Sequence, residues 1–166
     1  MKKIDLCGEW LLYGGEYNGI PASVPGCVHT ALRAGGYIPD MFYRDNNLSL
    51  QWIGESDWEY RRSFFCDRAE GASLLFMGLD TYADILLNGV LIGSADDMFI
   101  PYRFDVEGVL RRGENLLSVR FRSPIREVEG CPERRGAFTT ERINTRRIQC
   151  TIAWSFWATI SLKIII

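Results

Sequence analysis

The sequence predicts an all-β fold, a β-sandwich or barrel, from three observations. First, Asn88-Gly89 separates the apolar runs 82–87 and 90–92, and this is the strongest short-range signal of a β-hairpin because both turn residues accept a positive φ. Second, apolar and polar residues alternate in 58–64 and 116–122, the period of strands with one buried face. Third, turn signals recur about every eight to twelve residues, as in β-sandwiches.

The amino-terminal part contributes one strand and the single short helix that we predict. Residues 5–13 alternate loosely between apolar and polar and favour a first strand. Residues 28–34 are followed by Gly35-Gly36, a typical helix stop, and Pro39 prevents continuation of the helix.

The later elements are strands, with one unusual connection. Residues 73–77 form a continuous apolar run that favours a central strand, and residues 102–106 predict another. Residues 160–166 are strongly apolar and predict a closing strand of the sandwich. Residues 124–145 instead crowd charged side chains without apolar periodicity. A structureless stretch of that length is either functional or disordered.

Composition bounds the class of protein. The chain of 166 residues, 47% hydrophobic, predicts one domain spanning residues 1–166 with its own core. A net charge of −2 provides no field that attracts nucleic acid or an anionic membrane, so neither is expected as a partner. No apolar signal segment follows Met1, and the last seven residues are too few to span a bilayer. The five cysteines are widely spaced, which fits reduced thiols and a cytoplasmic location.

The polar residues predict no catalytic or metal site and no cofactor. His29 is the only histidine, with Cys27 two residues away, and we interpret it as a packing or capping residue at the start of the helix. Asp80 and Asp84 would lie about 13 Å apart along a strand, too far for a retaining carboxylate pair. We expect Asp80 to accept hydrogen bonds from backbone amides. Asp96-Asp97 could suggest a calcium site, but no further oxygen ligands follow at regular spacing, so we interpret the pair as a solvated turn.

Several segments, in their order and spacing, carry a resemblance to a known family. The chain resembles the amino-terminal sugar-binding domain of glycoside hydrolase family 2 enzymes, and it is most similar to the β-mannosidases. The resembling segments are residues 8–10, 24–30, 38–43, 52–53, 57–60, 78–89, 98–99, 102–106 and 121–124. The resemblance implies a jelly-roll-like, galactose-binding-domain-like β-sandwich. In the family it precedes an immunoglobulin-like domain and a (β/α)8 barrel that carries both catalytic glutamates of a retaining mechanism. We expect those domains to be absent here and the chain alone to be inactive.

Aromatic side chains are the candidate sugar-binding residues, because pyranose rings stack on exposed Trp and Tyr. Trp10, Trp58 and Phe64 fall in strand patterns and are predicted to be core. Trp52, Trp154 and Trp157 are the predicted substrate-binding residues, in or beside loops.

A departure from the family pattern affects the last two of these tryptophans. The β-mannosidases carry a Gly-Trp-Asp-Trp-Gly-Pro motif whose Asp reaches the sugar. In one alignment Trp154 matches its first Trp and Ser155 replaces the Asp. In another, residues 157–164 form the last strand and most of the motif is deleted. Either way the carboxylate that contacts the substrate is missing.

The leading hypothesis is therefore a non-catalytic domain of a β-mannosidase-like glycosidase that packs against the catalytic barrel and reaches β-mannosides only through the full-length enzyme. Two alternatives stay open. One is a free-standing carbohydrate-binding module. The other is a structural domain that self-associates as a homodimer through an apolar surface.

Overall fold

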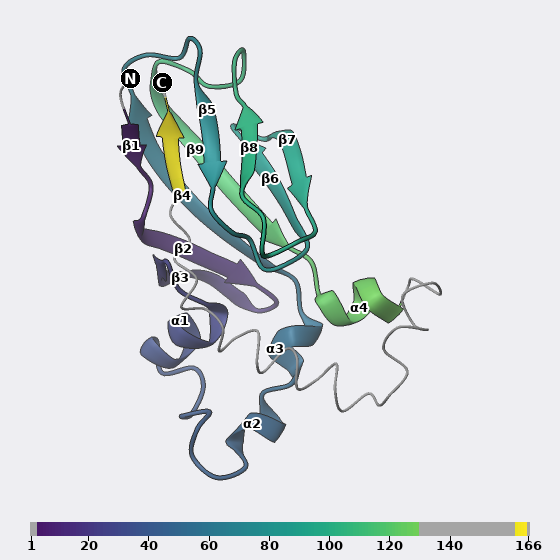
Figure 1. The fold of residues 1–166 in the computed structure, drawn as a ribbon. Helices are drawn as coiled ribbons and strands as arrows, with labels where there is room; N and C mark the ends of the chain where they lie inside the picture. Colours follow the sequence, from purple (N-terminus) through teal and green to yellow (C-terminus); the bar gives the residue numbers. More distant parts are fainter. Residues whose placement is uncertain (1–2, 130–161, 166) are drawn as a thin grey trace.

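The computed structural model describes residues 3–129 and 162–165 (Figure 1). Two antiparallel sheets lie face to face, as the sequence predicts for an all-β sandwich. The four-stranded sheet has the order β1-β10-β5-β8, and the six-stranded sheet has the order β3-β2-β4-β9-β6-β7. The strands are β1 Lys3–Asp5, β2 Gly8–Gly14, β3 Tyr17–Val24, β4 Trp58–Cys66, β5 Ser73–Phe76, β6 Ala83–Leu87, β7 Val90–Ala95, β8 Tyr102–Asp105, β9 Gly113–Phe121 and β10 Leu162–Ile165.

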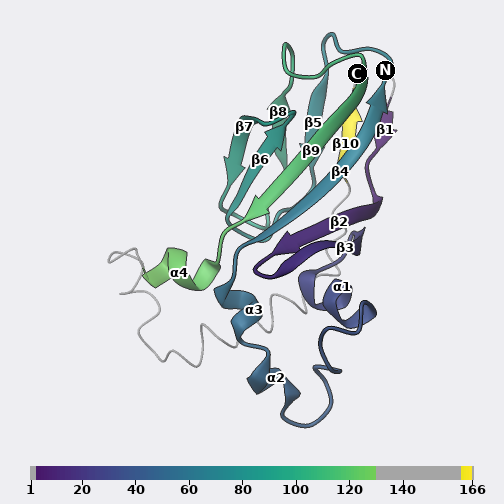
Figure 2. The ribbon, with the colours of Figure 1, turned by 180° about the vertical axis from the view of Figure 1, so that it is seen from behind.

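In the described residues four short helices accompany the strands, so the prediction of a single helix is wrong. α1 spans Val28–Ala34, as predicted, and α2 Asn46–Ser49, α3 Trp52–Glu55 and α4 Pro124–Glu129 add to it. Two of these are four residues long, too short to produce a helical period in the sequence. α4 occupies the start of the segment predicted as an unusual connection. All four gather at one end of the sandwich, as the reverse view shows (Figure 2).

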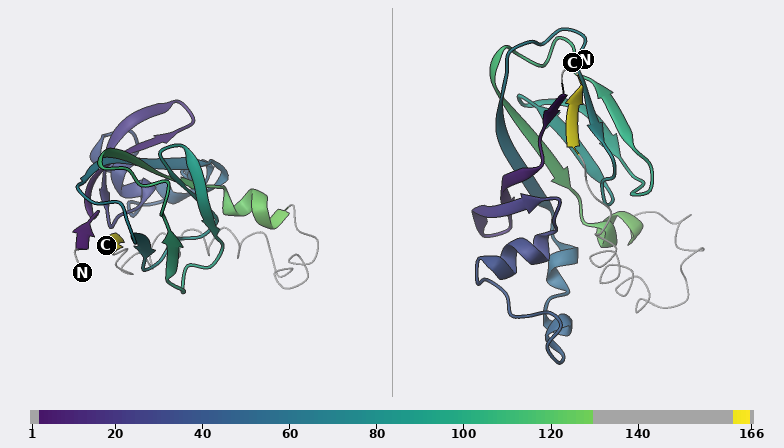
Figure 3. Two further views of the ribbon diagram at one scale, coloured as in Figure 1. Left: turned by 90° about the horizontal axis from the view of Figure 1, so that it is seen from above. Right: turned by 60° about the vertical axis from the view of Figure 1, so that its left-hand side comes forward.

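The core lies between the two sheets. Trp58, Tyr60 and Phe64 of β4 are buried, whereas the residues between them are more exposed. Trp10 is also buried, so all three predicted core aromatics are confirmed. The view from above shows the two layers on either side of this core (Figure 3).

The predicted hairpin joins β6 to β7. Leu87 pairs with Val90, leaving Asn88 and Gly89 as a two-residue turn. Their φ angles are 52° and 83°, as a turn with positive φ at both positions requires. Within the described residues, no helix is long and apolar enough to cross a membrane.

Candidate functional site

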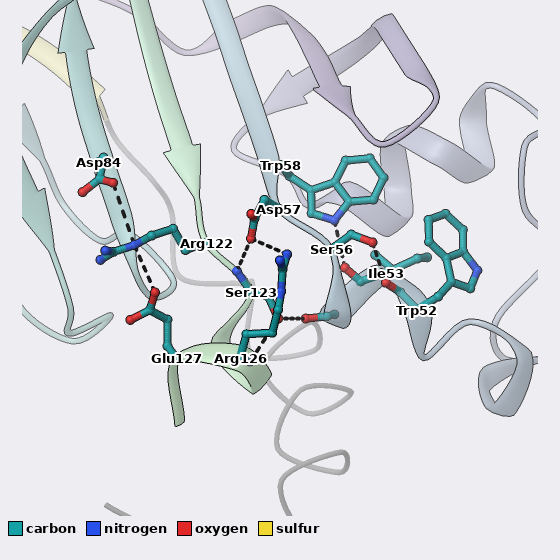
Figure 4. A network of polar contacts seen from close by, with 11 residues as sticks. Trp52, Ile53, Ser56, Asp57, Trp58, Asp84, Arg122, Ser123, Arg126 and Glu127 are labelled. Carbon is teal, nitrogen blue, oxygen red and sulfur yellow. Dashed lines mark hydrogen bonds and ion pairs between the residues drawn. The ribbon is translucent and has the colours of Figure 1, made fainter. Parts of the chain in front are cut away.

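The candidate site lies at the end of the sandwich where β4 begins and β9 ends. There α3 precedes β4 and α4 follows β9, so two segments far apart in sequence meet (Figure 4). Of the three tryptophans predicted to bind sugar, the structure places Trp52 at this end. Trp154 and Trp157 lie outside the described residues.

Trp52 belongs to a cluster of aromatic rings. Tyr17 stacks on both Trp52 and Trp58, with 6.0 Å between ring centroids in each pair. Tyr37 contacts Tyr17 edge to face at 5.3 Å and is 54% exposed. Trp52 is the first residue of α3, and its side chain is half-buried against the core. Part of the Trp52 ring is therefore exposed to solvent, but neither whole face of the ring is open.

Hydrogen bonds to backbone carbonyls hold α3 against β4. The Trp58 indole Nε1 donates to the Ile53 carbonyl at 2.8 Å, and Ser56 Oγ donates to the Trp52 carbonyl at 2.8 Å (Figure 4). The last turn of α3 thus has acceptor groups satisfied by side chains. This fixes the position of Trp52 relative to the buried Trp58.

A second set of contacts ties α3 to α4 through Ser123, which is 1% exposed. Ser123 Oγ donates to the Gly54 carbonyl at 2.8 Å and accepts from the Arg126 backbone amide at 3.3 Å. The Ser123 amide donates to Asp57 Oδ1 at 2.7 Å, and Arg126 forms an ion pair with the same oxygen at 2.8 Å (Figure 4). We call Asp57, Ser123 and Arg126 the clasp.

Arg122 lies beside the clasp and faces two carboxylates. Its Nε is 3.8 Å from Asp84 Oδ2 and 3.5 Å from Glu127 Oε1. Ser94 Oγ also donates to Asp84 Oδ1 at 2.7 Å. Asp84 is therefore neutralised and hydrogen-bonded, as a structural carboxylate is.

Asp80 differs from the sequence prediction. Its Oδ1 accepts from the neighbouring Thr81 hydroxyl, and its buried Oδ2 has no hydrogen-bond partner in the described part of the chain. The expectation that Asp80 accepts from backbone amides is thus wrong. Burial raises the pKa of this carboxyl, and the Thr81 hydrogen bond partly opposes the shift.

Cys27 and His29 form no nucleophilic pair. Cys27 is the N-cap residue of α1, and Thr30 Oγ1 donates to its carbonyl at 2.7 Å and accepts from its amide at 3.1 Å. His29 is half-buried, and burial lowers its pKa. Among residues 3–129 and 162–165, no three His, Cys, Asp or Glu side chains form a group that could hold a metal ion.

The two antiparallel sheets, packed face to face with short helices at one end, place this protein in the class of jelly-roll-like β-sandwich domains. The family described as the glycosyl hydrolase 2 galactose-binding domain-like family matches residues 10–164, and the chain belongs to it.

Its relatives include β-mannosidases. The β-mannosidase of Capra hircus is 36% identical over 173 residues, covering 92% of this chain and 19% of the relative. The β-D-mannosidase structure from Dictyoglomus thermophilum is 40% identical with a TM-score of 0.75, covering 78% of this chain and 17% of that one. An exo-chitosanase from Amycolatopsis orientalis, 16% identical with a TM-score of 0.66, shares the fold. The chain spans about a fifth of the length of the curated relatives it matches.

Proposed function

We propose that this chain serves as the amino-terminal, non-catalytic domain of a β-mannosidase-like glycoside hydrolase. The observation that carries the proposal is the family match together with the 36% identity to a β-mannosidase over nearly the whole chain. In this role the chain is one domain that packs against a catalytic barrel and helps to shape a pocket for a single terminal β-mannose. In this proposal, carbohydrate contacts the chain only as a ligand of the longer enzyme. That enzyme would act in the cytoplasm.

An activity assay and a chimera test this role. The isolated chain should not hydrolyse an aryl β-mannoside, because the reaction needs two carboxylates that the family carries elsewhere. Placed in the Dictyoglomus enzyme instead of the residues it matches, the chain should allow the rest of the enzyme to fold, with weaker hydrolysis than the parent enzyme because the carboxylate that contacts the substrate is missing from this chain. Turnover by the isolated chain that depends on one of its own residues would overturn the proposal, as would a chimera that does not fold.

A second candidate function is sugar binding by the chain itself, favoured by the half-buried Trp52 and the exposed Tyr37, which both contact Tyr17. Titration with mannose and mannobiose should then change tryptophan fluorescence saturably. Trp52→Phe keeps an aromatic ring in the cluster, whereas Trp52→Ala removes it, so binding should survive the first change better. A flat titration in the parent chain would exclude this candidate.

Self-association is the third role, and exposed apolar side chains favour it. They include Phe42, Tyr43, Leu48, Phe65, Leu91 and Phe99. Self-association requires that some of them form one contiguous apolar patch, because singly scattered apolar side chains are normal on a monomer. Light scattering at high concentration should then show a homodimer. A clean monomer would contradict this role without affecting the first proposal.

A further inference from the structure

The chain contains two Asn-Gly pairs, Asn18-Gly19 and Asn88-Gly89. Such a pair is chemically labile, because the backbone nitrogen of the glycine can attack the side-chain amide of the asparagine, and glycine has no Cβ to obstruct the approach. The attack requires that the asparagine side chain can turn toward the glycine and that the backbone between the two residues can rotate. The structure treats the two pairs differently in both respects.

The Asn88 side chain is held in place by three hydrogen bonds. Its Nδ2 donates to the Val109 carbonyl at 2.9 Å and to Asn115 Oδ1 at 2.8 Å, and its Oδ1 accepts from the Leu116 amide at 3.0 Å. The Asn88 backbone amide also donates to the Leu116 carbonyl at 2.8 Å. The side-chain amide can therefore turn toward Gly89 only after the hairpin of β6 and β7 has separated from Val109 and β9.

The Asn18 side chain has no such restraint. Asn18 is exposed in β3, an edge strand of the six-stranded sheet (Figure 2), and no described residue hydrogen-bonds to its side chain. In the pairing of β2 with β3, Tyr13 lies opposite Asn18 and Leu12 lies opposite Ile20. Gly19 therefore has no partner on β2 and forms a β-bulge, with a φ of 77°. Rotation of the backbone between Asn18 and Gly19 thus disturbs little of the sheet.

We propose that Asn18 is a modification site at which the folded chain deamidates spontaneously, and that Asn88 is protected until its hairpin opens. The Gly19 backbone nitrogen attacks Asn18 Cγ, so that an N–Cγ bond forms and the Cγ–Nδ2 bond breaks. The Nδ2 group leaves as ammonia, with the proton that the Gly19 nitrogen gives up. Water then opens the resulting cyclic imide at either of its carbonyls, which leaves aspartate or isoaspartate at position 18. The proposal is independent of the role of the chain in a glycoside hydrolase.

The modification changes the edge of the sheet in two ways. Either product places a negative charge opposite Tyr13, whose ring lies 4.4 Å from the Arg61 guanidinium. Isoaspartate also lengthens the backbone of β3 by one methylene group, which breaks the match between the two strands. The pairs of Tyr13 with Asn18 and of Gly14 with Tyr17 end this ladder, so they are the ones that the modified chain should lose.

The test is peptide mapping of the whole chain after incubation in mildly alkaline buffer at a temperature at which it stays folded. Mass spectrometry measures the deamidated fraction of the peptide that carries each pair, and chromatography separates the aspartate and isoaspartate forms. Asn18 should deamidate at least about tenfold faster than Asn88, which corresponds to about 1.4 kcal/mol of protection by the fold. Asn18→Gln is the matched control. It keeps the amide group but requires a larger ring for the attack, so its peptide should stay unmodified.

Unfolding in urea separates the effect of the fold from that of the local sequence. In urea the two pairs should react at similar rates, because the hydrogen bonds that protect Asn88 are lost. The rate at Asn18 in the folded chain should rise with pH, since the attacking nitrogen must give up its proton. Hydrogen exchange at residues 13–18 should be faster in the modified chain than in the fresh one. Equal rates for Asn18 and Asn88 in the folded chain would overturn the inference, as would a difference that persists unchanged in urea.

Discussion

At the scale of single residues, Asp80 is the clearest case in which the sequence misleads. A short acidic residue before a strand is typical of turn hydrogen bonds to backbone amides, yet the structure buries its Oδ2 without a partner. Nothing local in the sequence distinguishes the two situations, because burial here depends on the packing of distant segments. Trp52 illustrates the same limit, since its stacking on Tyr17 joins residues 35 positions apart in sequence.

Replacing Asp80 with Asn should stabilise the chain at neutral pH. Burial raises the pKa of the Asp80 carboxyl, so the carboxyl proton is bound more tightly in the folded state than in the unfolded state. Below the unfolded-state pKa, both states are protonated and no stability is lost. As pH rises through the folded-state pKa, the free energy of unfolding falls, because a buried carboxylate must ionise.

Asp80→Asn removes that ionisation, so urea unfolding at neutral pH should show a gain on the order of 1 kcal/mol. The gain should shrink near pH 4, where the carboxyl is increasingly protonated in both states. Asp45→Asn changes the same charge at an exposed position and is the matched control for the loss of one negative charge. A larger gain for Asp80→Asn in acid than at neutral pH would contradict the argument.

At the scale of elements, α4 could have been predicted from the sequence, whereas the four-residue helices could not. Ser123 followed by Pro124 is a helix start signal, with a capping side chain before a proline at the first helical position. The charge-rich composition that follows hid this signal. α2 and α3 offer only one turn each and carry no period to detect. Their positions depend on side-chain contacts such as Trp58 to Ile53.

Ser123→Ala should loosen the join between α3 and α4. The change leaves the Gly54 carbonyl and the Arg126 amide without the hydroxyl that each contacts. Losing these two hydrogen bonds costs about 1–3 kcal/mol in total, measured by urea unfolding, and should speed hydrogen exchange in α4. Ser63→Ala, at an exposed position of β4, should do neither. Unchanged exchange in α4 would show that the clasp does not hold this helix.

Asn88 has a role beyond the predicted turn. Its Nδ2 donates to the Val109 carbonyl at 2.9 Å and to Asn115 Oδ1 at 2.8 Å, and its Oδ1 accepts from the Leu116 amide at 3.0 Å. The Asn-Gly pattern could predict the hairpin, but these contacts span more than 20 positions and could not be read locally. The side chain fastens the hairpin to the turn before β9.

Asn88→Gly should separate the two roles, since glycine keeps the positive φ and removes the three side-chain hydrogen bonds. At about 1 kcal/mol each, their loss should lower the free energy of unfolding by about 2–3 kcal/mol. Gly89→Asn is the matched control in the same turn. Its φ suits Asn and no atom lies within 4 Å of an added Cβ, so the cost should stay below about 1 kcal/mol. Equal costs for the two variants would assign Asn88 a turn role alone.

At the scale of the whole molecule, most strand positions could be predicted, but β3 and the order of the strands could not. Alternation and turn signals act within a few residues, whereas the pairing of β9 with both β4 and β6 brings together segments far apart in sequence. The closing strand predicted at the end of the chain is β10. It lies between β1 and β5 in the four-stranded sheet. The last described strand therefore pairs with the first strand on one side and with a strand from the middle of the chain on the other.

This arrangement makes β10 a test of how the sandwich closes. Lys163 pairs with Asp5 of β1 on one side and Leu75 of β5 on the other. A proline at this central position removes the backbone donor and is poorly tolerated in a strand with neighbours on both sides. Lys163→Pro should therefore lower the free energy of unfolding by about 3 kcal/mol. Lys163→Ala retains the backbone amide and should cost much less. Because β1 and β5 would each lose a neighbour and expose an unpaired edge, the proline variant should also aggregate during refolding. If proline and alanine variants were equally stable, β10 would be an addition to a sheet already complete without it.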